Sequence, residues 1–141
     1  MKIKFNKINI LNSLKMDYKK NNYKYWLPFV LVALTIFILS HQPTLPYLSA
    51  NFEYEDKIKH FIAFYTLGIC FILAALKTKS FTVKQLFIIN FVVCSLYGAL
   101  DEFHQSFIIG RESEIYDWLA DSIGGLVSCF FIPLINTKIK K

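Results

Sequence analysis

The amino-acid sequence predicts an all-α polytopic membrane protein with four transmembrane helices and both termini in the cytoplasm. Hydrophobic residues occupy 55% of the 141 positions and the mean hydropathy is +0.40, more than an ordinary soluble domain carries. These residues form long runs, whereas a soluble core needs apolar positions at helical or alternating spacing. A third observation, the uneven distribution of charge, predicts the orientation.

Four apolar runs are each expected to form a transmembrane helix. The first follows Lys24 and covers about 25–40, and the second covers 58–76. The third covers about 86–100, and the fourth about 116–135. The first and third are shorter than the ~20 residues that cross ~30 Å of hydrocarbon, so they must include flanking polar residues. This shortness predicts a polar patch below one membrane surface.

Basic residues predict how these helices are oriented. Thirteen of the sixteen lie before the first run, between the second and third runs, or after the fourth. The other connections and the helix ends beside them hold nine of the ten acidic residues. Because cytoplasmic segments are enriched in Lys and Arg, the acid-rich connections are expected to face outward. The chain is therefore expected to comprise a basic cytoplasmic segment at 1–24, a multi-pass domain in the cytoplasmic membrane at 25–135, and a basic cytoplasmic tail at 136–141.

Most side chains capable of chemistry lie on this outer side, at helix ends. Asp56 and Lys57 precede His60 by four and three residues, which places them on its side of a helix. Asp101 and Gln105, at the end of the third run, are also four residues apart. The other candidates are Tyr65, Glu102, Arg111, Asp117, Asp121 and Gly124.

Some of these residues have a simpler interpretation when each is taken alone. The Lys57 amine could extend to the membrane surface, and Asp117 could gain ~0.3–1 kcal/mol from the helix dipole. Gly124 could permit close helix packing, and Tyr65 could fill space between helices. Asp121 is harder to explain, because a lone carboxylate one turn inside the membrane is costly unless it is paired or neutralised. The set favours a functional site, with three helix ends converging on an acid-rich cavity, over a network that only fixes helix packing.

Read in order, these residues resemble a known family. The pattern D-K-x-x-H-F, then D-E-x-x-Q, then G-R, then D-x-x-[AL]-[ND]-x-x-G is similar to that of the VanZ-like integral membrane family. It stands here at 56–61, 101–105, 110–111 and 117–124, and the stretch at 40–43 resembles the family's S-x-Q-P. The similarity spans about 36–128. Two features depart from the pattern: Asp121 stands where Asn is common, and Glu112 and Glu114 make the preceding loop more acidic.

The resemblance implies a membrane fold and an association with the cell envelope. The family's founding member is associated with low-level resistance to the glycopeptide antibiotic teicoplanin, and no reaction is settled for the family. Antibiotic resistance for this chain therefore follows from analogy alone.

One hypothesis is an enzyme that acts on the head group of a lipid or a lipid-linked cell-envelope precursor. Arg111, with Lys57, would hold a phosphate, and His60 or Glu102 would act as general base. Asp101, Asp117 and Asp121 would hold a divalent cation such as Mg²⁺ or Mn²⁺, which prefer oxygen ligands. The residues assigned to catalysis are His60, Asp101, Glu102, Asp117 and Asp121; those assigned to substrate binding are Lys57, Gln105 and Arg111; those assigned to structure or orientation are Asp56, Tyr65 and Gly124.

A second hypothesis is a membrane protein that binds lipid head groups, or alters the outer surface, without turnover. A third is transport, which is less favoured because the charges gather at one surface and no inverted repeat is evident. The residues do not decide between the enzyme and the binding protein. The expected partners are membrane lipids or lipid-linked envelope precursors, with no nucleic acid. A homo-oligomer stays open, because four helices alone need not enclose a cavity.

Overall fold

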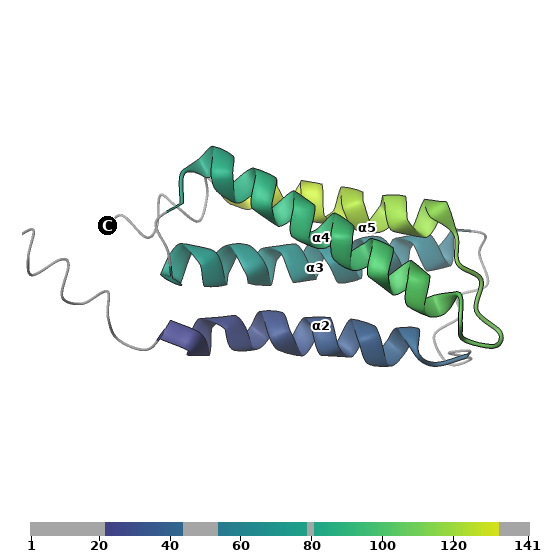
Figure 1. Ribbon diagram of the computed structural model, residues 1–141. Helices are drawn as coiled ribbons and strands as arrows, with labels where there is room; N and C mark the ends of the chain where they lie inside the picture. The colour runs from purple at the N-terminus through teal and green to yellow at the C-terminus, as the bar shows by residue number, and fades with distance from the viewer. Residues whose placement is uncertain (1–21, 44–53, 79–80, 133–141) are drawn as a thin grey trace, which may run out of the picture.

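The computed structural model describes residues 22–43, 54–78 and 81–132, and every regular element in these ranges is helical. The elements, in chain order, are η2 (Asn22–Trp26), α2 (Leu27–Ser40), α3 (Glu55–Thr78), α4 (Val83–Gln105), α5 (Ile115–Ser128) and η4 (Cys129–Phe131), where η denotes a 3-10 helix (Figure 1). The all-α prediction is thus confirmed for the described residues. The predicted tail at 136–141, and all but the last three residues of the predicted segment at 1–24, lie outside them.

In the part of the chain that the structure describes, three helical segments are long and apolar enough to cross a membrane. They are Tyr23–Ser40, Glu55–Thr78 and Val83–Gln105. Each contains one of the first three predicted runs and extends beyond it into polar residues, as the shortness of the first and third runs requires. The chain therefore has the helices of a membrane protein.

Within the described residues, the fourth run does not form one uninterrupted α-helix. The α5 helix has 14 residues and gives way to the 3-10 helix η4 at Cys129, and residues 133–135 of the expected helix lie outside the described ranges. At 1.5 Å per residue, α5 extends about 21 Å, which is less than the thickness of a hydrocarbon core. The crossing of the membrane by α5, and the side on which the termini lie, stay predictions.

Local sequence signals explain two of the helix starts. Thr82 caps α4 because its hydroxyl accepts from the Gln85 backbone N–H at 3.2 Å, while the Gln85 side chain accepts from the Thr82 N–H at 3.0 Å. This reciprocal capping box satisfies two donors that a helix start leaves free. Pro28 lies in the first turn of α2, where its missing N–H costs no helical hydrogen bond.

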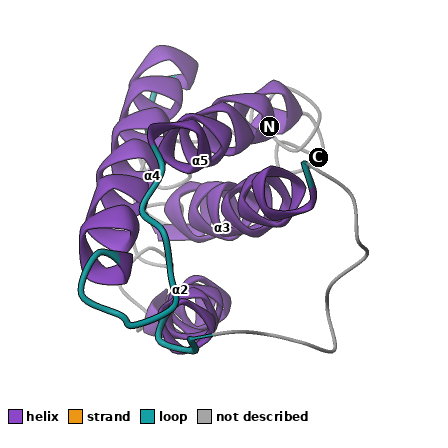
Figure 2. Ribbon diagram, turned by 90° about the vertical axis from the view of Figure 1, so that its right-hand side faces the viewer, coloured by secondary structure: helices purple, strands orange, loops and turns teal. Residues whose placement is uncertain are grey.

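Glycines let α5 approach its neighbours closely. A Cβ at Gly124 would lie 2.5 Å from the carbonyl oxygen of Phe61 in α3, and a Cβ at Gly125 would lie 2.3 Å from the Cβ of Cys94 in α4. Small residues at such contacts allow helix backbones to pack tightly where no hydrophobic effect drives them together. Figure 2 shows α5 beside both α3 and α4.

The interior of the bundle is mostly apolar, and α2 packs onto it along one side. Phe64, Leu67 and Ile72 of α3 are fully buried. Phe29 of α2 packs against both hydrophobic clusters of this interior. Other α2 side chains, such as Leu31, remain exposed, as a surface facing lipid tails would be.

The polar helix ends gather at one end of the bundle. Figure 1 shows the C-terminal ends of α2 and α4 beside the N-terminal ends of α3 and α5. The loop that joins α4 to α5 lies at this end as well. Antiparallel packing therefore brings together residues that are far apart in the sequence, such as Ser40 and Gln105, which are 65 positions apart.

Candidate functional site

His60 forms the centre of the polar end of the bundle. Its Nδ1 lies 2.9 Å from Oδ1 of Asp121 in α5 and 3.9 Å from Oε1 of Glu102 in α4. Asp121 is fully buried, and His60 and Glu102 are each less than one-tenth exposed. The hydrogen bond from His60 offsets part of the cost of burying the Asp121 carboxylate.

Gly98 makes room for the Asp121 carboxylate. A Cβ at position 98 would lie 2.7 Å from Oδ2 and 2.8 Å from Cβ of Asp121, so no larger residue fits without a shift. The sequence analysis did not single out Gly98. The available signal was a glycine one helical turn before Asp101, inside an otherwise apolar run.

Asp101 is held by two neutral donors. The Ser40 hydroxyl donates to its Oδ1 at 2.6 Å, and Nε2 of Gln105 donates to its Oδ2 at 2.8 Å. The same Gln105 nitrogen lies 3.0 Å from the Ser40 oxygen, and all three residues are buried. The expected shared face of Asp101 and Gln105 is therefore present. Ser40, which the sequence analysis noted only within the S-x-Q-P stretch, belongs to the cluster.

Lys57 pairs with two acidic residues at the start of α5. Its Nζ lies 2.7 Å from Oε2 of Glu114 and 3.1 Å from Oδ1 of the buried Asp117. The backbone N–H of Glu114 also donates to Oε2 of Glu102 at 2.9 Å. Glu114 thus connects Lys57 to the His60 centre, a role that its position in an acidic loop did not reveal in advance.

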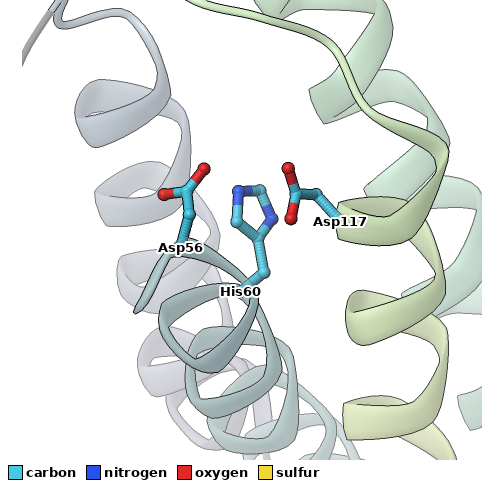
Figure 3. A group of neighbouring side chains, drawn as sticks. All are labelled: Asp56, His60 and Asp117. Carbon is cyan, nitrogen blue, oxygen red and sulfur yellow. The ribbon is translucent and has the colours of Figure 1, made fainter. Parts of the chain in front are cut away.

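Among the described residues, two groups of three have the composition and spacing to hold a metal ion, and both include His60. One comprises Asp56, His60 and Asp117, and the other comprises His60, Asp101 and Glu102; within each group the ligand atoms lie within 4.8 Å of one another. Figure 3 shows the His60 ring between the Asp56 and Asp117 carboxylates. From the sequence, we expected Asp101, Asp117 and Asp121 to hold the cation, with His60 outside this set of ligands.

Negative charge exceeds positive charge around His60. Five carboxylates surround it, and Lys57 is the cation that contacts one of them. The five are Asp56, Asp101, Glu102, Asp117 and Asp121. In the described chain, Oε1 of Glu102 and Oδ2 of Asp121 are buried without a hydrogen-bond partner. Such groups in low-dielectric surroundings favour a bound cation or proton.

Arg111 is the one cation of the connecting loop, and it forms no ion pair with any acidic residue in the described ranges. Its Nε is buried and has no hydrogen-bond partner there. The preceding Gly110 has a φ of +87°, a left-handed conformation that other residues adopt at a cost. The turn at Gly110 fixes the position at which the Arg111 side chain leaves the backbone. The Arg111 guanidinium, without an acidic partner in the described ranges, can bind an anion.

Tyr65 and Gly124 lie away from the polar cluster. The Tyr65 ring contacts those of Phe61 and Phe131, with centroids 6.1 and 5.9 Å apart. Gly124 lies against the backbone of α3. Their contacts are those of helix packing, and the structural or orienting assignment made for them stays a prediction.

The exposed His41 and the partly buried His104 form a separate pair at the same end of the bundle. Nδ1 of His41 lies 3.3 Å from Nε2 of His104, and the rings stack with centroids 5.4 Å apart. Phe37 packs against His104. The pairing of residues that are 63 positions apart had no signal in the sequence.

Comparison with known proteins identifies the family of the chain. The family model described as VanZ/LLP1 matches residues 4–136, which confirms the resemblance drawn from the motifs. No curated protein and no solved structure gave a match. Because the family model covers nearly the whole sequence, the chain belongs to the VanZ/LLP1 family.

Proposed function

We propose that this chain binds the head group of a membrane lipid or of a lipid-linked cell-envelope precursor at the polar end of its bundle, and that His60 acts on that head group as a general base. The proposal places this end at the outer face of the cytoplasmic membrane. A role in teicoplanin susceptibility would follow as a consequence of altered envelope chemistry, in line with the association of the family.

The observation that carries the proposal is the hydrogen bond between His60 and Asp121. A buried carboxylate on Nδ1 fixes the orientation of an imidazole and stabilises its protonated form. The other ring nitrogen, Nε2, has no hydrogen-bond partner in the described ranges and is the atom that would accept a proton. A carboxylate and a histidine that served only to fix helix packing would not need one ring nitrogen bound to the carboxylate and the other open to a substrate.

Arg111 supports the phosphate-binding part of the proposal. Lys57 already contacts Glu114 and Asp117, so Arg111 is the cation at this end that keeps its charge free for a ligand. A guanidinium matches the geometry of phosphate oxygens and binds them through two parallel hydrogen bonds. The apolar surfaces of the surrounding helices would accommodate the acyl or prenyl chain of the same ligand.

The alternative is a protein that binds the same head group without turnover. It uses the same residues, and it differs in one outcome: no lipid species is consumed or produced. The decisive comparison is therefore chemical analysis of the membrane.

The experiment uses matched cells that make the native chain, His60→Gln, Glu112→Gln or no chain, at equal protein levels in the membrane. Glu112 is an exposed acid in the α4–α5 loop and serves as the control. Lipids and envelope precursors are extracted and compared by mass spectrometry. We expect one species to change with the native chain and with Glu112→Gln, and to stay unchanged with His60→Gln. Identical profiles in all four would reject catalysis and favour the binding protein.

A further inference from the structure

We propose that the polar end of the bundle binds one divalent transition-metal ion through His60, Asp101 and Glu102, with Zn²⁺ bound more tightly than Mn²⁺ and Mn²⁺ more tightly than Mg²⁺. The use of this ion in chemistry rests on the proposed function, because it supplies that site with a cofactor. The binding of the ion does not rest on it, and it is measured without lipid.

The three side chains have suitable positions. They come from two helices, α3 and α4, and each offers a ligand atom within 4.8 Å of the other two. Ligands that surround an ion at about 2.0–2.2 Å lie at most about 4.4 Å apart, so small side-chain movements complete the site. All three residues are buried, which protects an ion from competition by water.

Glu102 supplies the independent observation that points to a ligand. It is 7% exposed, and its Oε1 has no hydrogen-bond partner in the described ranges, although it faces Nδ1 of His60 at 3.9 Å. A buried carboxylate oxygen without a partner carries the full cost of its lost hydration. A metal ion bound between Glu102 and its neighbours would remove that cost.

Each of the three candidate ligands is also oriented by a further partner. Asp121 holds His60, the Glu114 backbone N–H holds Glu102, and Ser40 and Gln105 hold Asp101. Ligating carboxylates are usually hydrogen-bonded themselves, and Asp101 and Glu102 have this property. The nitrogen of His60 that faces Glu102 is the Nδ1 that Asp121 holds, so an ion bound there would replace the proton between Nδ1 and Asp121 and would leave Nε2 free.

The donor set selects the kind of ion. Two carboxylates and one imidazole offer mixed oxygen and nitrogen ligands, which suit Zn²⁺, Mn²⁺ and related ions. Mg²⁺ favours oxygen ligands and keeps several waters, so it fits a buried imidazole site poorly. The set at Asp56, His60 and Asp117 is the weaker candidate, because Lys57 already neutralises Asp117 and Asp56 is partly exposed.

The test measures metal binding directly on the full chain. The purified protein, in detergent or lipid nanodiscs, is treated with a chelator, dialysed against Zn²⁺ and analysed for bound metal. We expect one tightly bound Zn²⁺ per native chain. An excess of Mn²⁺ should displace it, whereas the same excess of Mg²⁺ should not. Glu102→Gln and His60→Gln should lose it, whereas Asp121→Asn should bind about 10–100-fold more weakly, as expected for an orienting partner.

Two controls separate this site from others. His104→Gln removes the exposed His41–His104 pair, and Glu112→Gln removes an exposed acid; both should retain the tight site. Loss of Zn²⁺ in His104→Gln would show surface binding and overturn the proposal. Retention in Glu102→Gln with loss in Asp117→Asn would also overturn it, since the ion would then belong to the other group.

The remaining outcomes are equally informative. If His60→Gln and Glu102→Gln do not fold, the Zn²⁺ content of the native chain and of His104→Gln decides, and a native chain without tight Zn²⁺ rejects the proposal. Zn²⁺ binding together with unchanged lipid profiles would support the metal site and contradict the proposed function. Altered lipid profiles with no bound metal would support the proposed function and reject the metal site.

Discussion

Asp101 shows how both oxygens of a buried carboxyl group can be hydrogen-bonded at the end of an apolar helix. Both of its oxygens accept hydrogen bonds, from Ser40 and from Gln105, and none of its described partners carries a positive charge. Removal of its charge can therefore be separated from removal of its hydrogen bonds. This distinction allows a test of whether the cluster is functional or only structural.

Asp101→Asn should abolish function with little loss of folded protein. The Gln105 amide can turn and the Ser40 hydroxyl can rotate, so an asparagine keeps most of the hydrogen bonds. Asp101→Ala, in contrast, should cost about 1–3 kcal/mol because two buried donors lose their acceptor. Lipid profiles and thermal unfolding of the two variants in detergent provide the readouts. If Asp101→Asn unfolds as readily as Asp101→Ala, the network is structural.

Lys57→Met should destabilise the protein by leaving Asp117 buried without its cation. Breaking a fully buried pair costs about 3–5 kcal/mol. A smaller loss is expected here, since the Lys57 side chain is 25% exposed. Adding Asp117→Asn to Lys57→Met should restore part of the stability, as measured by thermal unfolding. Equal stability of the single and double variants would show that the pair contributes little.

The sequence predicted which residues lie at this end of the bundle better than it predicted the contacts between them. Spacing placed Asp101 with Gln105 and Lys57 with His60, because residues on one helix have a known geometry. Contacts between helices, such as His60 with Asp121 or Ser40 with Asp101, depend on how closely the helices approach. That approach depends on Gly98 and Gly124, whose partners cannot be read from a single apolar run.

At the scale of the helices, α5 depends on glycine for its position beside α3. The Cβ of an alanine at 124 would meet the backbone of Phe61 and Tyr65, which cannot move as a flexible side chain would. The helix would have to shift outward and carry Asp117 and Asp121 with it. The site therefore depends on a contact that lies outside it.

Gly124→Ala should destabilise the bundle by about 1–3 kcal/mol, the usual cost of overpacking. Weaker Zn²⁺ binding should accompany the loss, because Asp121 moves away from His60. Ile123→Ala is the matched control, since Ile123 is the preceding residue and is half exposed. Thermal unfolding of the two variants side by side gives the comparison. An unchanged Gly124→Ala protein would contradict the tight α3–α5 contact.

Apolar runs predicted α2, α3 and α4 because long stretches of hydrophobic residues have few other stable conformations in a membrane. Their ends were harder to predict, since α4 continues through the polar residues 101–105 that other helices satisfy. In the fourth run the α-helix changes to a 3-10 helix at Cys129, which the hydropathy did not predict. The fourth run contains two buried aspartates and two glycines. Its mean hydropathy therefore averages a polar surface that packs against other helices and an apolar surface that would face lipid.

At the scale of the whole molecule, the two ends of the bundle differ in charge. The described part of the α3–α4 end carries Lys77 and Lys84, whereas the opposite end carries the acidic cluster. This polarity predicts that the α3–α4 connection faces the cytoplasm and the site faces outward. The proposed function requires the same orientation, because a head group of the outer leaflet can reach only that side.

Cysteine labelling in intact cells tests this orientation. Glu112 and Lys84 are both exposed and lie at opposite ends of the described bundle, so each is replaced by cysteine in turn. A membrane-impermeant maleimide should label Glu112→Cys and leave Lys84→Cys unlabelled until the cells are opened. The native chain measures background, because Cys94 and Cys129 are buried and Cys70 is partly buried. The reverse pattern would place the site in the cytoplasm, where outer-leaflet lipids and glycopeptides do not reach it, and the proposed function would then have to be abandoned even if the metal site were present.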